Sequence, residues 1–252
     1  MEPFFFGPPE RRLFGVYHAP APTAMKDCGV VFCYPLAHEY YNARLYTVQV
    51  AASLCRAGLP VLRFDYYGTG ESAGDFQEAS VAQWLDDIGL ACDELRSRGC
   101  RRLCLAGLRF GATLAGLFCT NPNAADALVL WEPIAKGADY LREIAGLHRE
   151  VLAGVPLQDA CEEHELLSFE FSKHLRGEIA AIDLQMNRLN LSRDVLLIES
   201  ADGNLQAALE KAAGRVDYES TPLSPFWQGK HGIAMPAQAP QLMTNWILRA
   251  CC

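Results

Sequence analysis

Residues 101–115, RRLCLAGLRFGATLA, form the stretch that decides the fold. The apolar run 103–106 predicts a short buried strand, and residues 112–118 have the pattern of a helix. Between them stands the pentapeptide Gly107-Leu108-Arg109-Phe110-Gly111. Its two glycines indicate a sharp turn from strand to helix, because a Cβ atom at either position would clash. The pattern therefore places Arg109 at the tip of this turn, above the edge of the sheet and at the N-terminus of the helix.

The rest of the chain alternates between strand-like and helix-like patterns. Continuous apolar runs predict buried strands at 29–34, 127–131 and 195–198, and the mixed stretches 59–65 and 216–219 are also predicted as strands. Helical patterns predict helices at 43–56, with Asn42 as the N-cap, at 81–98, and around 242–247. Residues 4–6 and 12–18 predict an antiparallel hairpin at an edge. This alternation indicates the fold class α/β, a mostly parallel central sheet with helices on both faces and ligands bound beyond the carboxyl ends of the strands.

One segment interrupts the alternation. From residue 134 to residue 193 the strand-like runs vanish, and charged, helix-forming residues dominate. We expect residues 1–133 and 194–252 to form the core, and residues 134–193 to form a helical cap inserted over the site. A cap in this position would determine the substrate specificity.

Composition excludes several classes of protein. The formal net charge of −8 disfavours nucleic acid and anionic membranes as partners. No run approaches the ~18 apolar residues of a membrane span, and the N-terminus lacks the basic region of a secretory signal. The ten cysteines include no CxxC pair and no zinc-ligand spacing, which indicates a reducing cytoplasm; neither a metal nor a cofactor is expected. The expected partner is a small acyl or anionic molecule, and a homodimer is left open.

The strand-turn-helix pattern is similar to the nucleophile elbow of α/β-hydrolases. In those enzymes the nucleophile at the turn is followed along the chain by an acid and then by a histidine. That order corresponds here to Arg109, Asp202 and His231. A hydrogen bond between Asp202 and His231 would fix the tautomer of the imidazole and stabilise its protonated form. Two alternatives stay open: the pair never meets, or Glu132, at the end of the preceding strand, is the acid.

Arg109 cannot itself attack a carbonyl, because a guanidinium stays protonated and offers no lone pair. It can bind a carboxylate or a phosphate with two hydrogen bonds, and the helix behind it favours an anion at the same point. The alternative is structural: Arg109 pairs with Glu39, Glu132 or Asp202 and fills the place of the missing nucleophile.

Backbone donors for an oxyanion hole survive the loss of a serine. The N–H of Phe110, with one from Leu36 or Ala37, would supply them, and His38 and Glu39 follow in the same substrate-binding segment. Two other side chains are weaker candidates for a relocated nucleophile. These are the thiol of Cys33, near the end of its strand, and the hydroxyl of Ser72.

Several further segments carry a resemblance to a known family. The loop 65–75 is similar to the D-x-R-G-x-G-x-S loop of α/β-hydrolases, with Tyr67 where arginine is usual. Nearly the whole chain resembles the exosortase A system-associated hydrolases, through segments 34–39, 68–76, 107–112, 130–133 and 225–227, together with Asn42 and Arg44. This resemblance implies hydrolase activity and an arginine at the turn as a family feature, but no particular substrate. The stretch 229–232, GKHG, departs from the family.

Two functions follow as predictions. The first is an enzyme that acts on a small acyl compound without a serine nucleophile. Arg109 grips an anionic group, and His231, oriented by Asp202, is the general base for water or for a substrate proton. This covers hydrolysis and, equally, lyase- or isomerase-type chemistry. The alternative is a catalytically inactive pseudo-hydrolase that serves as a binding or scaffold protein.

Overall fold

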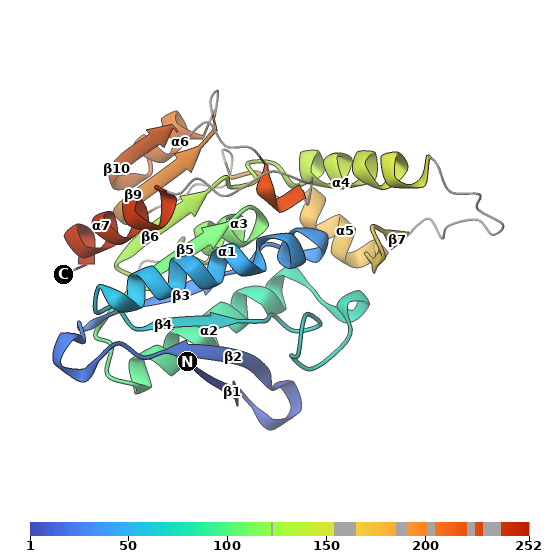
Figure 1. The fold of residues 1–252 in the computed structure, drawn as a ribbon. Coiled ribbons are helices and arrows are strands. Elements are labelled where there is room, and N and C mark those ends of the chain that lie inside the picture. Colours follow the sequence, from blue (N-terminus) through green and yellow to red (C-terminus); the bar gives the residue numbers. More distant parts are fainter. Residues whose placement is uncertain are drawn as a thin grey trace.

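An eight-stranded sheet forms the centre of the computed structural model, which describes residues 1–121, 123–153, 165–184, 191–200, 205–220, 225–228 and 238–251. The strand order is β1-β2-β4-β3-β5-β6-β9-β10 (Figure 1). The strands are β1 (Glu2–Phe6), β2 (Leu13–His18), β3 (Cys28–Cys33), β4 (Val61–Phe64), β5 (Arg102–Leu108), β6 (Ala127–Trp131), β9 (Leu191–Glu199) and β10 (Ala213–Ser220). Strands β4, β3, β5, β6, β9 and β10 are parallel, and the β1–β2 hairpin joins β4 antiparallel. The predicted fold class is therefore confirmed.

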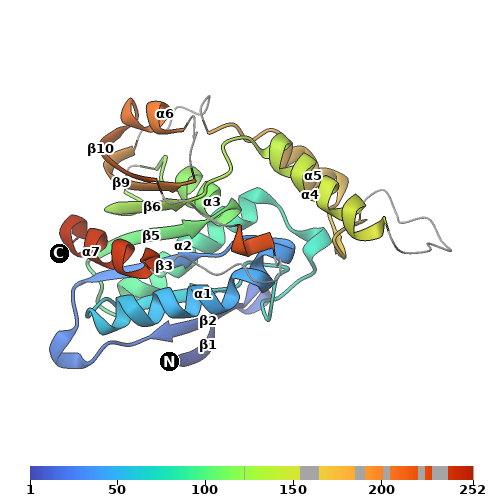
Figure 2. The same ribbon diagram turned by 45° about the horizontal axis from the view of Figure 1, so that its top comes forward.

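Helices cover both faces of this sheet. Helices α1 (Ala37–Arg56) and α7 (Ala239–Cys251) pack together on one face, and α2 (Val81–Ser97) and α3 (Phe110–Phe118) pack together on the other (Figures 1 and 2). The short helix α6 (Gln206–Glu210) packs on β10. The described ranges also contain four 3-10 turns: η1 (Pro9–Arg11), η2 (Pro22–Ala24), η3 (Phe76–Glu78) and η4 (Phe226–Gln228). None of the helices in the described ranges is long and apolar enough to cross a membrane.

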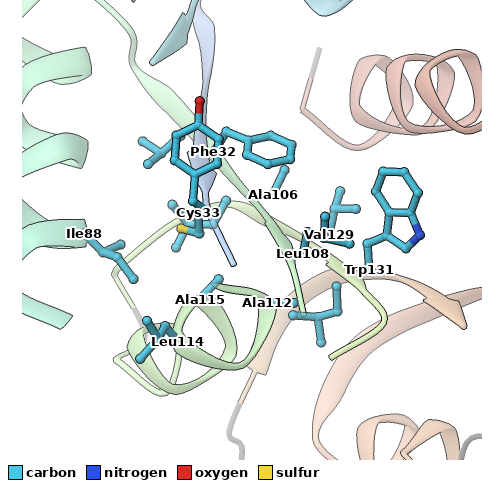
Figure 3. Packing of buried hydrophobic residues seen from close by; sticks show 14 of the residues in the cluster. Phe32, Cys33, Ile88, Ala106, Leu108, Ala112, Leu114, Ala115, Val129 and Trp131 are labelled. Atoms are coloured by element: carbon cyan, nitrogen blue, oxygen red, sulfur yellow. The ribbon is translucent and has the colours of Figure 1, made fainter. Parts of the chain in front are cut away.

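The core lies between the central strands and the helices on either side. Every residue of β3 and of β6 is buried, as expected for parallel strands covered on both faces. Figure 3 shows Ile88 of α2 and Ala112 and Ala115 of α3 packed against these strands. All eight cysteines in the described ranges are free thiols, and seven of them are buried as small apolar side chains.

The segment between β6 and β9 lies beyond the carboxyl end of the sheet (Figure 2). It contains α4 (Gly137–Leu152), α5 (Lys173–Ala180) and a two-stranded hairpin of β7 (Glu165–Leu166) and β8 (Phe169–Glu170). The expectation of a segment without strands is therefore wrong. Strand β9 also begins at Leu191, three residues before the predicted return to the core at residue 194. That this segment acts as a cap stays a prediction.

The first long helix also differs from its prediction. Helix α1 begins at Ala37 rather than near residue 43, so Asn42 lies inside the helix and does not cap it. The Nδ2 of Asn42 instead donates a hydrogen bond to the backbone oxygen of Trp227, 2.8 Å away. The added first turn contains Glu39, whose side chain is fully buried. A tertiary ion pair of Glu39, described below, stabilises a turn that local sequence does not predict.

Candidate functional site

The turn at Arg109 joins β5 to α3. Arg109 stands between Leu108, the last residue of β5, and Phe110, the first residue of α3, with φ 55° and ψ −124°. A Cβ on Gly107 would lie 2.4 Å from the Cα of Ala112, and a Cβ on Gly111 would lie 2.2 Å from the backbone oxygen of Tyr34. Both glycines are therefore required by backbone contacts, as the sequence pattern predicts.

Two glutamates hold the Arg109 side chain. Its Nε lies 2.8 Å from Oε1 of Glu39, at the start of α1, and its Nη2 lies 2.6 Å from Oε2 of Glu143, on α4. Arg109 is only 7% exposed. Burial by itself lowers the pKa of the guanidinium, but the charges of Glu39 and Glu143 raise it above its ordinary value. The cation thus links the sheet, α1 and the segment beyond the sheet.

The charge balance around Arg109 limits what it can bind. The described residues offer no acceptor to its Nη1, and its Cζ lies 5.1 Å from the ring centre of Trp227. Two carboxylates already face this single positive charge, so a further free anion would meet repulsion from both. One terminal nitrogen remains able to donate a hydrogen bond to an uncharged oxygen.

Glu39 is one of the three acids that sequence analysis named as partners of Arg109, whereas Glu143 was missed. Glu39 is 1% exposed; burial raises its pKa, and Arg109 opposes that rise. The hydroxyl of Tyr140 on α4 lies 3.5 Å from its second oxygen. Nothing in the spacing of residues 134–152 distinguishes Glu143 from the other charged residues of α4, because the pairing depends on where that helix lies in space.

His38 lies beside this ion pair, and both of its ring nitrogens are buried without a hydrogen-bond partner among the described residues. Burial lowers the pKa of His38 to about 4; Glu143 acts to raise it and Arg109 to lower it. The imidazole is therefore neutral at pH 7, and it has one N–H donor and one nitrogen acceptor available for hydrogen bonds. Buried polar atoms rarely lack hydrogen-bond partners. The two ring nitrogens of His38 therefore indicate a position where a ligand or a water molecule binds.

Two more acids lie at the ends of neighbouring strands. Glu132 follows β6 with φ 46°, and its Oε1 accepts a hydrogen bond of 2.5 Å from the backbone N–H of Ser200. Glu199 is the last residue of β9 and is 6% exposed, and one of its carboxylate oxygens has no partner in the part of the chain that the structure describes. Burial, with the charge of Glu132, raises the pKa of Glu199 to about 7. Sequence analysis named Glu132 but missed Glu199, although its position directly after an apolar run was a usable signal.

The predicted oxyanion segment lies next to the start of α3. Phe110 opens that helix, so its N–H is one of those that a helix leaves without an internal acceptor. The close approach of Gly111 to the backbone of Tyr34 brings the end of β3 against this turn. Ala37 opens α1 with φ 52°, and both Leu36 and Ala37 are buried. The two strand-to-helix connections that would supply the donors are therefore adjacent.

A cavity of about 250 Å³ opens beside the start of α1. It lies between Ala37, the loop 68–76 and Phe169 of β8, and it is also bordered by Tyr40 and Phe76. This cavity is bounded by the connection from β3 to α1, by the loop 68–76 and by β8, and it is large enough for a small acyl chain. Among the described residues, no three His, Cys, Asp or Glu side chains gather as a metal site.

Asp202 and His231 lie outside the described residues, so their pairing stays a prediction. The two relocated nucleophiles are not available. Cys33 is fully buried, and burial raises the pKa of its thiol well above the ordinary value. The Oγ of Ser72 donates to the backbone oxygen of Asp65 (2.6 Å) and accepts from the backbone N–H of Phe14 (2.9 Å), which makes it a structural residue of its loop.

Comparisons with known proteins give a family and a fold. Residues 32–173, more than half of the chain, match the family model described as serine aminopeptidase, S33. No curated protein matches the sequence. Because neither this match nor any solved structure below names the exosortase A system-associated hydrolases, that narrower resemblance stays a prediction.

Solved structures of similar fold cover nearly the whole chain. A ferulic acid complex of Est1E from Butyrivibrio proteoclasticus has a TM-score of 0.69 at 15% identity, over 98% of each chain. Proline iminopeptidase of Mycobacterium smegmatis has a TM-score of 0.66 at 12% identity, over 99% of this chain and 98% of that one. The Pyrococcus furiosus esterase Pf2001 has a TM-score of 0.68 at 15% identity, over 99% and 90%. At such identities the likeness shows the fold alone.

Proposed function

The chain belongs to the serine aminopeptidase, S33, family of the α/β-hydrolase superfamily, and from that premise we propose that it hydrolyses a small acyl compound without a serine nucleophile. The substrate class is an ester, a thioester or an amide. One observation carries the proposal: the tip of the strand-to-helix turn holds the guanidinium of Arg109, which cannot attack a carbonyl. The acyl group must then be attacked by water.

In this proposal Arg109 binds the acyl oxygen. Glu39 and Glu143 fix the guanidinium in one orientation and leave Nη1 as a donor. A negative charge that develops on the acyl oxygen would be stabilised by Nη1 and by the N–H of Phe110. A substrate carboxylate, which arginine also suits, would meet the two glutamates as well. The geometry therefore favours an acyl oxygen over the anionic group that the sequence alone predicts.

The proposed general base is His231, oriented by Asp202, with Glu132 as the alternative acid. The base takes a proton from water as the water oxygen attacks the acyl carbon. The bond to the leaving group then breaks, and the leaving group takes up the proton. Glu199, whose pKa is raised to about 7, can hold or release a proton near neutral pH, whereas His38, whose pKa is lowered to about 4, stays neutral and can only form hydrogen bonds.

The test combines a substrate panel with a matched pair of variants. Purified protein is assayed against short-chain esters, thioesters and amides. His231→Ala should lower kcat/KM by about a hundredfold or more. His174→Ala, which removes an exposed histidine of α5, is the control and should leave turnover unchanged. A fluorophosphonate, which labels activated serines, should neither label the protein nor inhibit it. Full turnover in His231→Ala, or inhibition by the fluorophosphonate, would contradict the proposal.

The second candidate is a binding protein without catalysis, which one observation favours. The Arg109 guanidinium is neutralised by two acids and almost sealed from solvent, as in a structural ion pair. If this candidate is right, no member of the panel turns over, while one of the same acyl compounds still raises the melting temperature.

A further inference from the structure

A second cavity, of about 470 Å³, lies on the α1 side of the sheet near its β2 edge. It is bordered by apolar and aromatic side chains and by two arginines, and the residues that matter here are Val16, Tyr41, Leu45, Val48, Arg44 and Arg63. The volume is within the range of sites for small organic molecules. Neither Arg109 nor Phe110 borders it, so its function is a separate question.

Arg63 is the unusual member of this cavity. It lies on β4, is 7% exposed, and carries a positive charge that no described carboxylate contacts. Its Nε donates to Nε2 of His18 over 2.9 Å, and its Nη1 donates to the hydroxyl of Tyr34. Burial lowers the pKa of His18 to about 4, so this acceptor is neutral at pH 7. Both hydrogen-bond acceptors of this buried cation are neutral, and Asp65 acts on it only at longer range: Arg63 lowers the pKa of Asp65, but the two side chains form no ion pair.

The acid nearest to this cation is already engaged. Asp65 borders the same cavity, but its two oxygens accept from the hydroxyl of Tyr40 (2.8 Å) and from the backbone N–H of Glu71 (3.0 Å). Nη2 of Arg63 forms no hydrogen bond to any residue in the described ranges, and Arg44 adds a second positive charge at the exposed side of the cavity. The lining thus combines two arginines and two acids, Asp65 and Glu71, with apolar and aromatic side chains.

We propose that this cavity binds a small organic carboxylate with an apolar or aromatic body. The carboxylate contacts Nη2 of Arg63 and the side chain of Arg44, because arginine donors match the oxygens of a carboxylate. The body lies against Val16, Leu45 and Val48 and against the exposed ring of Tyr41. Glu71, exposed at the rim, weakens the binding by repulsion.

The test uses 4-phenylbutyrate and its neutral amide, 4-phenylbutanamide, in calorimetric titrations of the whole chain. We expect saturable one-to-one binding of the carboxylate, with the amide at least about tenfold weaker, since it lacks the charge that strengthens the hydrogen bond. Arg44→Ala should weaken the carboxylate about threefold to fivefold, and Glu71→Gln should tighten it about twofold to threefold. Arg56→Ala, an exposed arginine at the other end of α1, is the matched control and should change nothing.

A variant of the buried arginine completes the test. Arg63→Lys keeps the charge but loses the planar set of donors, so it should weaken the carboxylate at least about tenfold. The melting temperature shows whether this variant folds, and the Arg44 and Glu71 variants carry the test if it does not. The proposal is overturned if the acid and the amide bind equally or if neither binds at about 10 mM, where millimolar affinities are measurable. It is also overturned if inorganic phosphate binds but the carboxylate does not.

Discussion

Arg109 and Arg63 are equally buried arginines on the same sheet, and their partners differ completely. Each is 7% exposed. Arg109 meets two carboxylates, those of Glu39 and Glu143, whereas Arg63 meets the neutral acceptors His18 and Tyr34. Burial of a cation therefore says little by itself about ligands. Arg109, paired with two acids, links distant elements of the fold, whereas Arg63, which forms no ion pair with a described residue, is left able to contact a charged ligand.

The largest expected effect comes from removing the cation that two acids share. Arg109→Met should lower the free energy of unfolding by about 3–5 kcal/mol, because it leaves the fully buried Glu39 without its partner. Chemical denaturation measures the change. Arg142→Met, an exposed arginine of α4, is the control and should cost less than about 0.5 kcal/mol.

A double variant separates lost charge from lost packing. Adding Glu39→Gln to Arg109→Met removes the stranded carboxylate, so part of the lost stability should return. A loss below about 1 kcal/mol in Arg109→Met, or no recovery in the double variant, would remove the contrast with Arg63.

The next effect concerns Glu199, an acid at the same edge of the sheet as Arg109 but without a cation of its own. Burial, with Glu132, raises its pKa to about 7 from 4.5. The folded protein therefore keeps a proton that the unfolded chain loses, and this contribution to stability is full below pH 4.5 and is lost as the pH rises to 7. The loss is up to about 3 kcal/mol.

Glu199→Gln should flatten this fall, as seen in denaturation curves between pH 4.5 and 7. His18 and His38, whose pKa values are lowered to about 4, act in the opposite direction, with stability lost as the pH falls from 6.5 to 4. Only the difference between wild type and variant isolates Glu199. Glu219→Gln, an exposed acid of β10, is the control; if both variants have the same pH profile, Glu199 is not the group responsible.

The smallest effect is expected at Arg63. Arg63→Met leaves His18 and Tyr34 without a donor but strands no charge, so the cost should be about 1–3 kcal/mol. Burial is the main cause of the lowered pKa of His18 and Arg63 adds to it, so the variant should raise that pKa part of the way towards 6.5. NMR titration of His18 measures this. A loss of stability as large as that of Arg109→Met would mean that the charge balance does not distinguish the two arginines.

Local sequence patterns were sufficient to predict those features of the fold that local backbone geometry causes. The turn at Arg109 was predicted from two glycines, because the clash of a Cβ with the backbone at Ala112 or Tyr34 follows from the turn itself. The buried strands were predicted from continuous apolar runs. The start of α1 was not predicted, because its first turn is stabilised by the pairing of Glu39 with Arg109, seventy positions away along the chain.

The candidate site also divides into residues that local sequence predicts and residues whose roles depend on tertiary contacts. Arg109, Glu39 and Glu132 could be named because each is next to a predicted strand or turn. Glu143 could not, because its role depends on how α4 lies across the end of the sheet. The positions of His38 and Glu199 after apolar runs are visible in the chain, but their roles depend on polar atoms that are buried without a partner among the described residues, which is a property of packing.

The sequence by itself determined the α/β architecture, the turn with an arginine at its tip, and the absence of a nucleophile there. These follow from periodicity, from the steric needs of glycine and from the chemistry of a guanidinium. Only the tertiary structure decided that Arg109 is neutralised by acids and that Arg63 is not. The energy of a buried charge depends on which groups lie within a few ångströms of it, and folding brings those groups together from distant parts of the chain.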